Sequence, residues 1–342
     1  MKRTEPQLAG NAHRKWAFSA AKLALGVGLV WWLIQSGRFD PGVYGALLQE
    51  RTACFLLGVF LSQWIMLLVP FVRWWLLARA TGLPISLGEA VRLGLKGAFA
   101  NLFVPGGLGI DGVRLLHLRR YHRRQFLDGA ASVVLDRALG VLALLILGGV
   151  CSLILLARNH SPWMLRLVLV NGLLLVVLLA ALGIVCGFVR PQMLDRLRHI
   201  RLLDHLLHAF HAYRGHRRTL AWGLLLSLIG HVGVCCAAAF ALLSLGYPAF
   251  LSAVFTATPI VTVARSIPLT PLGLGVSDSV AAFLYPVVGL QGGAEVQMLL
   301  RASVTLIFLT CGVAYLRVRP EVVSRVPRPV DLAEDALVGG RA

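Results

Sequence analysis

The chain has 342 residues, of which 58% are hydrophobic and only 14% are charged, and its formal net charge is +18. Its mean hydropathy is +0.77. A soluble protein of this length would need a larger charged surface, so the composition excludes an ordinary soluble enzyme or binding protein and predicts an integral membrane domain.

Apolar stretches long enough to cross a bilayer, about 20 residues, recur along the chain. They are Trp16–Ile34, Ala53–Val72, Ala138–Ala157, Trp163–Val189, Thr219–Leu245 and Val296–Leu316. Two more apolar regions, roughly Leu87–Ile110 and Leu251–Leu290, contain helix breakers and look like discontinuous or re-entrant helices. We therefore predict an all-α polytopic helical bundle, a single membrane domain over residues 1–342 with halves at about 16–157 and 163–316 and tails at 1–15 and 317–342.

The two interrupted regions share one pattern of helix-breaking residues. The first reads VPGGLGIDGVR from Val104 and the second LTPLGLGVSDS from Leu269, and Gly82-Leu83-Pro84 upstream of the first is echoed by Gly246-Tyr247-Pro248. Paired interruptions in corresponding halves are typical of transporters, whose sites lie where the breaks meet. We predict that the breaks approach each other near the membrane middle and frame a polar cavity. The matched residues are Pro105, Gly107, Gly109 and Asp111 in the first break and Pro271, Gly273, Gly275 and Asp278 in the second.

Basic residues concentrate in alternate loops, and positive charge favours the cytoplasmic side. This bias predicts a multi-pass protein of the cell (inner or plasma) membrane with both termini in the cytoplasm. Arg114–Arg124 and Arg190–Arg218 are expected inside, and Asn159–Ser161 outside. The first break then enters from the cytoplasm and the second from the opposite face. Charge and motif repetition both predict an inverted repeat.

The basic loops and the histidines have explanations at the membrane surface. The loops are short and flank spans, which favours contact with anionic headgroups over nucleic-acid binding. His205, His208 and His211 recur every third residue, but leucines between arginines in the same stretch indicate an amphipathic helix on the membrane rather than a metal centre. The six cysteines lack zinc-ligand spacing. We expect no metal and no cofactor.

Charged residues within apolar segments are the candidate functional groups, because burial in lipid is costly unless the charge is paired or functional. Arg265 lies deep in an apolar stretch and either neutralises Asp278 or binds an anionic head group. We expect Arg114, Arg137 and Arg265 to supply positive charge to a substrate, while Asp111 and Asp278 orient them or exchange protons. The alternative is that these charges only tie the broken helices together, and that Asp136 and Arg137 only brace a loop. Glu89, Arg92, Lys96 and Arg301 complete the set.

Three motifs in order carry a family resemblance. FANLFVPGGLGIDGVRLLHL, then ASVVLDRALGVLALL, then RSIPLTPLGLGVSDSVAAFLY resemble the lysylphosphatidylglycerol synthase transmembrane-region family of flippase-like membrane proteins, over about Trp16–Leu316. The chain departs from the family pattern at Ile110, where a second glycine is common, and at Asp278, displaced by Ser277, where glutamate is usual. The resemblance implies an integral membrane protein that moves or handles lipids.

No motif for hydrolase, zinc-protease or ATPase chemistry is present. Pro320–Ala342 is too short for the aminoacyltransferase domain of fused family members, so we expect no enzyme activity. Three functions remain open: a flippase-like carrier of an anionic or sugar-bearing lipid, a secondary transporter of a soluble solute, and a non-transporting subunit of envelope-lipid synthesis. The expected partners are membrane lipids, with a second copy of the chain or a synthase or glycosyltransferase as further candidates.

Overall fold

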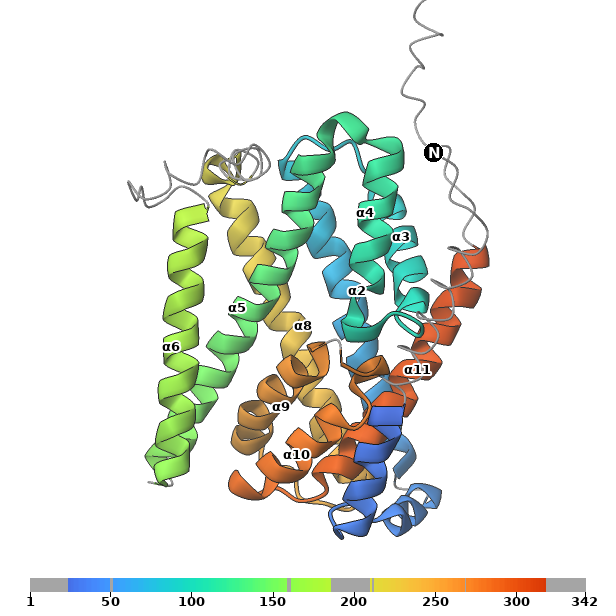
Figure 1. Ribbon diagram of the computed structural model, residues 1–342, viewed down its shortest axis with the longest axis vertical. Coiled ribbons are helices and arrows are strands. Elements are labelled where there is room, and N and C mark those ends of the chain that lie inside the picture. The colour runs from blue at the N-terminus through green and yellow to red at the C-terminus, as the bar shows by residue number, and fades with distance from the viewer. Residues whose placement is uncertain are drawn as a thin grey trace, which may run out of the picture.

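The computed structural model describes residues 24–49, 52–158, 161–185, 210, 212–267 and 269–317 (Figure 1). Every regular element in these residues is helical. An apolar helix, Ala24–Gln35, precedes the others. The first half contains η1 (Pro41–Leu48), α2 (Thr52–Ala80), α3 (Leu87–Ala100), η2 (Pro105–Gly107), α4 (Gly109–Tyr121), η3 (Arg123–Gln125) and α5 (Phe126–Arg158). After α6 (Pro162–Val185), the second half contains η5 (Ala212–Gly215), α8 (Arg217–Ser244), α9 (Leu251–Ser266), η6 (Pro271–Gly273), α10 (Val276–Val287) and α11 (Gly293–Arg317).

Five of the described helices, α2, α5 with η3, α6, α8 and α11, are long and apolar enough to cross a membrane. The prediction of an all-α, polytopic helical membrane protein is therefore confirmed. Of the six predicted spans, the first is described only from residue 24, and the residues of Trp163–Val189 beyond residue 185 lie outside the described chain. The amino-terminal arm, the carboxy-terminal tail and most of Arg190–Arg218, with His205, His208 and His211, also lie outside it.

One span begins earlier than hydropathy predicts. The expected segment was Ala138–Ala157, but α5 is helical from Phe126 and includes Asp136 and Arg137. Both charges have partners on neighbouring helices, so the helix continues through them without leaving a charge unpaired in an apolar body.

The echoed GLP and GYP sequences end α2 and α8 in the same way. Gly82 and Gly246 both have φ near +80°, a left-handed conformation that glycine adopts without steric cost. The residue after each glycine donates its N–H back to the helix, Leu83 to Ala78 and Tyr247 to Leu242. This is the usual glycine-terminated helix end. The chain reverses direction there, so α3 packs against α2 and α9 packs against α8.

From α2 and from α8 onward, the two halves repeat the order of long helix, short helix, 3-10 turn, short helix and long helix, with η3 as an extra turn before α5. α2 packs against α8, and η2 contacts η6. α5 packs against α9, just as α11 packs against α3. In Figure 1 the pair α3–α4 occupies the upper part of the molecule and α9–α10 the lower part, with the interruption of each pair directed to the middle. The two breaks therefore meet inside the helical body.

Close approach at glycines holds the central helices together. A Cβ atom on Gly58 of α2 would lie 2.8 Å from the Phe240 ring of α8, and one on Gly94 of α3 would lie 2.5 Å from the Phe71 ring of α2. Small residues at such crossings let apolar helices pack tightly where lipid offers no hydrophobic driving force. By contrast, α6 lies at the edge beside α5, and the most apolar part of α6 is not buried within the protein (Figure 1).

Candidate functional site

Each break is a short 3-10 turn that begins at the matched proline, Pro105 or Pro271. Two successive residues of each turn have positive φ: 72° and 67° at Gly106 and Gly107, 50° and 69° at Leu272 and Gly273. Glycine adopts this region freely, whereas an L side chain there costs roughly 1–2 kcal/mol. Leu272 is the one non-glycine residue with positive φ among those described. The second break therefore stores backbone strain that the first avoids.

Side chains satisfy the backbone where each helix resumes. The Gly109 N–H donates to Asn101 Oδ1 at 2.7 Å, and the two residues lie so close that a Cβ on Gly109 would be 2.7 Å from the Asn101 nitrogen. The Gly275 N–H donates to Asp278 Oδ2 at 2.6 Å, which is a helix cap from the first turn of α10. Buried backbone groups need such hydrogen-bond partners. The side chains of Asn101 and Asp278 therefore stabilise the interrupted helices.

An aspartate–arginine pair recurs in both halves. Arg137 Nε on α5 binds Asp111 Oδ2 at 2.5 Å, and its Nη2 donates to the Gly107 carbonyl at 2.7 Å. Arg301 Nη2 on α11 binds Asp278 Oδ2 at 2.7 Å and lies 3.4 Å from the Gly273 carbonyl. In each half, an arginine from the following long helix thus holds the aspartate and the matched glycine of the break.

The first half carries an additional buried ion network, and the ion pairs among the described residues of the second half include no counterpart. Asp136, 3% exposed, is bound by Arg73 Nε at 2.6 Å and by Arg114 Nη1 at 3.1 Å. Arg73 also donates to Ser227 on α8, and Arg114 donates to the Pro70 carbonyl at 3.1 Å. The network ties α2, α4, α5 and α8 together.

Arg114 therefore has a different setting from the one expected of a substrate-binding residue. Its side chain is 1% exposed, its guanidinium carbon lies 4.4 Å from the centre of the Trp74 ring, and protein oxygens bind it. Arg137, the second expected cation, has 42% of its side chain exposed although it is paired. Arg137 can release Asp111 and bind a ligand instead, because its side chain is not fully buried.

Arg265, the third expected cation, has no hydrogen bond and no ion pair with any residue in the described ranges. The sequence left two roles open for Arg265: neutralising Asp278 or binding an anionic head group. In the structure Arg301, not Arg265, forms the ion pair with Asp278. Arg265 is partly buried in the last turn of α9, and its side chain packs on Gly273, where a Cβ atom would lie 2.8 Å from Arg265 Cγ. Because α9 also contacts η2, this cation lies where the two breaks meet.

Buried hydroxyl groups lie near the same cation. Tyr285 of α10 is close enough to Thr258 and Gln297 for side-chain polar contact, and it lies near enough to Arg265 for electrostatic interaction. Among the described residues, neither the Tyr285 hydroxyl nor Thr258 Oγ1 has a partner in good hydrogen-bond geometry. A cation beside buried hydroxyls is a suitable environment for an oxygen-rich anion, because both groups donate to such a ligand.

Two residues of the charged cluster were not assigned to the site from sequence. The sequence pattern gives Arg301 as an ionisable residue in an apolar segment without a role, and it assigns no role to Arg73. The repeat itself indicated Arg301, since Arg137 follows Asp111 by 26 positions and Arg301 follows Asp278 by 23. Arg73 lies within an apolar run of α2, and a charge in such a run indicates a buried, paired residue.

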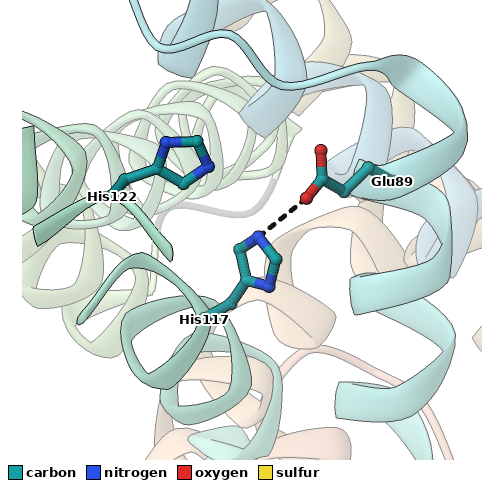
Figure 2. A group of neighbouring side chains, drawn as sticks. All are labelled: Glu89, His117 and His122. Atoms are coloured by element: carbon teal, nitrogen blue, oxygen red, sulfur yellow. Dashed lines mark ion pairs between the residues drawn. The ribbon is translucent and has the colours of Figure 1, made fainter. Parts of the chain in front are cut away.

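A separate group of potential metal ligands lies at the other end of α3 and α4, away from the break. Glu89, His117 and His122 bring their ligand atoms within 4.8 Å of one another (Figure 2). We expected no metal site from the sequence, in which Glu89 is far from the two histidines: Glu89 lies on α3, His117 on α4, and His122 directly after α4. The structure brings them together by packing the start of α3 against the end of α4.

Comparison with known proteins agrees with this architecture. The family model described as the lysylphosphatidylglycerol synthase TM region matches residues 19–317. No curated protein and no solved structure matches the chain.

Proposed function

The chain belongs to the lysylphosphatidylglycerol synthase TM region family, and from this membership and the two breaks we propose that it translocates or handles an anionic or sugar-bearing lipid across a membrane. We propose that it does so without enzyme activity of its own and that membrane lipids are its main partners. A second copy of the chain, or a synthase or glycosyltransferase that makes the lipid, is the protein partner this role calls for.

The observation that carries the proposal is the Arg265 guanidinium at the junction of the breaks, which has no acidic partner among the described residues. A charge held within an apolar body is costly unless it has a partner. The carbonyl end of α9 offers a partial negative charge, which is weaker than a full ion pair. An anionic head group would complete the compensation, and a phosphate matches the planar donors of arginine in two parallel hydrogen bonds.

The balance of charge around the breaks supports an anionic ligand. Among the described residues, the cluster contains five arginines and three aspartates: Arg73, Arg114, Arg137, Arg265 and Arg301 with Asp111, Asp136 and Asp278. Positive charge therefore exceeds negative charge by two. We assign Arg265 and the half-exposed Arg137 to the ligand, and Arg73, Arg114 and Arg301 to bracing the fold.

The matched halves support a mechanism of alternating access. With the exposed arginines at the α4–α5 connection in the cytoplasm, α3–α4 enters from that side and α9–α10 from the opposite side, as an inverted repeat of re-entrant elements. Movement of one helix pair relative to the other would open the junction to each face in turn. With this orientation, both termini lie in the cytoplasm and the protein lies in the inner or plasma membrane of the cell.

Reconstitution into liposomes tests the proposal. Lipids with a fluorescent label on an anionic or glycosylated head group are incorporated, and a membrane-impermeant quencher reports their movement between leaflets. We expect protein-dependent movement without ATP. Uptake of a soluble solute without lipid movement would identify a secondary transporter, and inactivity in both assays would favour a non-transporting subunit of lipid synthesis. Either outcome would overturn the proposal.

A further inference from the structure

Three side chains converge at the end of the α3–α4 pair that is opposite the break. Glu89 lies in the first turn of α3, His117 lies near the end of α4, and His122 is the residue directly after α4. Figure 2 shows Glu89 and His117 pointing toward each other, with the His122 ring beside them. His117 Nε2 lies 2.7 Å from Glu89 Oε1, and the centres of the two imidazole rings are 5.8 Å apart.

The ligand atoms of this group are buried and incompletely satisfied. The side chains of His117 and Glu89 are only 11% and 18% exposed. Glu89 Oε1, His117 Nε2 and His122 Nε2 are all inaccessible to solvent, and none of them has a well-directed hydrogen bond with another described residue. The short Glu89–His117 contact is an ion pair when the imidazole is protonated, but its geometry is poor for a hydrogen bond. Leaving buried polar atoms unsatisfied is costly, so these lone pairs need a further partner.

We propose that Glu89, His117 and His122 form a binding site for a divalent transition-metal ion, of which Zn²⁺ best fits the ligands. Two imidazole nitrogens and one carboxylate oxygen are a ligand set that zinc sites use, with a fourth position left for water or another ligand. Ligand atoms around a tetrahedral zinc at 2.0–2.1 Å lie about 3.3 Å apart. The Glu89–His117 contact has to open slightly and His122 has to move inward from a separation of at most 4.8 Å.

Neighbouring positive charge weakens this site without excluding it. Arg119, Arg120, Arg123 and Arg124 follow His117 along the chain, and all four are exposed. Exposed charges are screened by solvent and salt over roughly 8–10 Å. A bound ion would fasten the start of α3 to the end of α4. The metal site would therefore stabilise the packing of α3 against α4 at the end of the pair far from the break. This role does not depend on lipid binding at the junction of the breaks.

Metal binding to the full-length protein tests the site. Protein purified in detergent through a tag without histidine carries glutamine at His199, His205, His208, His211 and His216, which removes the other histidine-rich stretch. We expect this background to bind one Co²⁺ per chain, with the visible absorption of a four- or five-coordinate ion, and Zn²⁺ to displace it. His117→Ala and His122→Ala should each lower the affinity at least about tenfold. Glu89→Gln should weaken binding, while Asp128→Asn, a matched loss of one carboxylate on the start of α5, should leave it unchanged.

The proposal is overturned if the background binds no stoichiometric Co²⁺, or if both histidine variants bind it as the background does. A second measurement covers variants that fold poorly. X-ray absorption of the zinc-loaded background protein should show two imidazole nitrogens and one carboxylate oxygen in the first coordination shell. A shell of water oxygens alone, or of one imidazole, would identify an adventitious ion and contradict the assignment.

Discussion

Asp278 on α10 is bound by Arg301 on α11, whose Nη2 lies 2.9 and 2.7 Å from the two carboxylate oxygens. The same aspartate caps the Gly275 N–H, so its side chain is fully engaged and is 1% exposed. Arg265, the closest arginine to Asp278 along the chain, has no acidic partner in the part of the chain that the structure describes. Arg301 therefore stabilises the break, whereas Arg265 is available to a ligand.

Arg265→Gln should reduce lipid movement by at least about tenfold, because it removes the charge that we assign to the head group. It should change the midpoint of thermal unfolding in detergent very little, because no acidic residue loses its partner. Arg166→Gln on the peripheral α6 is the matched control, since Arg166 is exposed, lies over the Trp163 ring, and has no hydrogen bond or ion pair with another described residue. Undiminished lipid movement in Arg265→Gln would contradict the proposed role.

Arg301→Gln should destabilise the protein strongly. It leaves the buried Asp278 charge without a partner, a change that costs about 3–5 kcal/mol in buried pairs. Thermal unfolding in detergent should show a large decrease, and the double variant Arg301→Gln with Asp278→Asn should recover part of it. If the double variant is as unstable as the single one, the Asp278–Arg301 pair is not the cause.

Asp136→Ala should be more destabilising than any single substitution at an exposed charge. It leaves Arg73 and Arg114 facing each other with no shared carboxylate, and both are buried. The cost expected for breaking a buried pair is again about 3–5 kcal/mol. Asp128→Asn, at the start of the same helix, provides the comparison, and equal stability of the two variants would rule out the network as a brace.

Gly107→Ala should destabilise the first break by roughly 1–2 kcal/mol, because φ at this position is +67°. Gly112→Ala, in the following helix, is the matched control: a Cβ there meets no atom within 4 Å, and its φ is not positive. We expect Gly112→Ala to be neutral or slightly stabilising, since alanine favours helices. Equal loss in both variants would show that the positive φ is not the determinant.

The proposed orientation is tested by single-cysteine labelling in a background without the native cysteines. Cysteine at Asn159, which lies outside the described residues, should react with a membrane-impermeant reagent only from the outer face. Cysteine at Arg120, an exposed residue near the end of α4, should react only from the cytoplasm. Labelling of Asn159→Cys from the cytoplasm alone would overturn the topology.

The sequence was sufficient for the membrane class and for the places where helices are interrupted. A long apolar run in lipid must satisfy its backbone internally, and a helix is the direct solution, so α2, α6, α8 and α11 follow from hydropathy. The breaks are equally local, because proline and positive-φ glycine act on their own residues. This is why Pro105, Gly107, Pro271 and Gly273 could be named in advance.

The partners of the buried charges were decided only by the tertiary structure. The contacts of Asp278 with Arg301, of Asp136 with Arg73, and of Glu89 with His117 join residues on different helices. Each contact depends on the rotation of one helix against another, which is set by packing at many apolar side chains and glycines rather than by the charged residues themselves. For the same physical reason, the sequence alone could identify Arg265 as a buried cation, but it could not show that Arg301 had already taken its acidic partner.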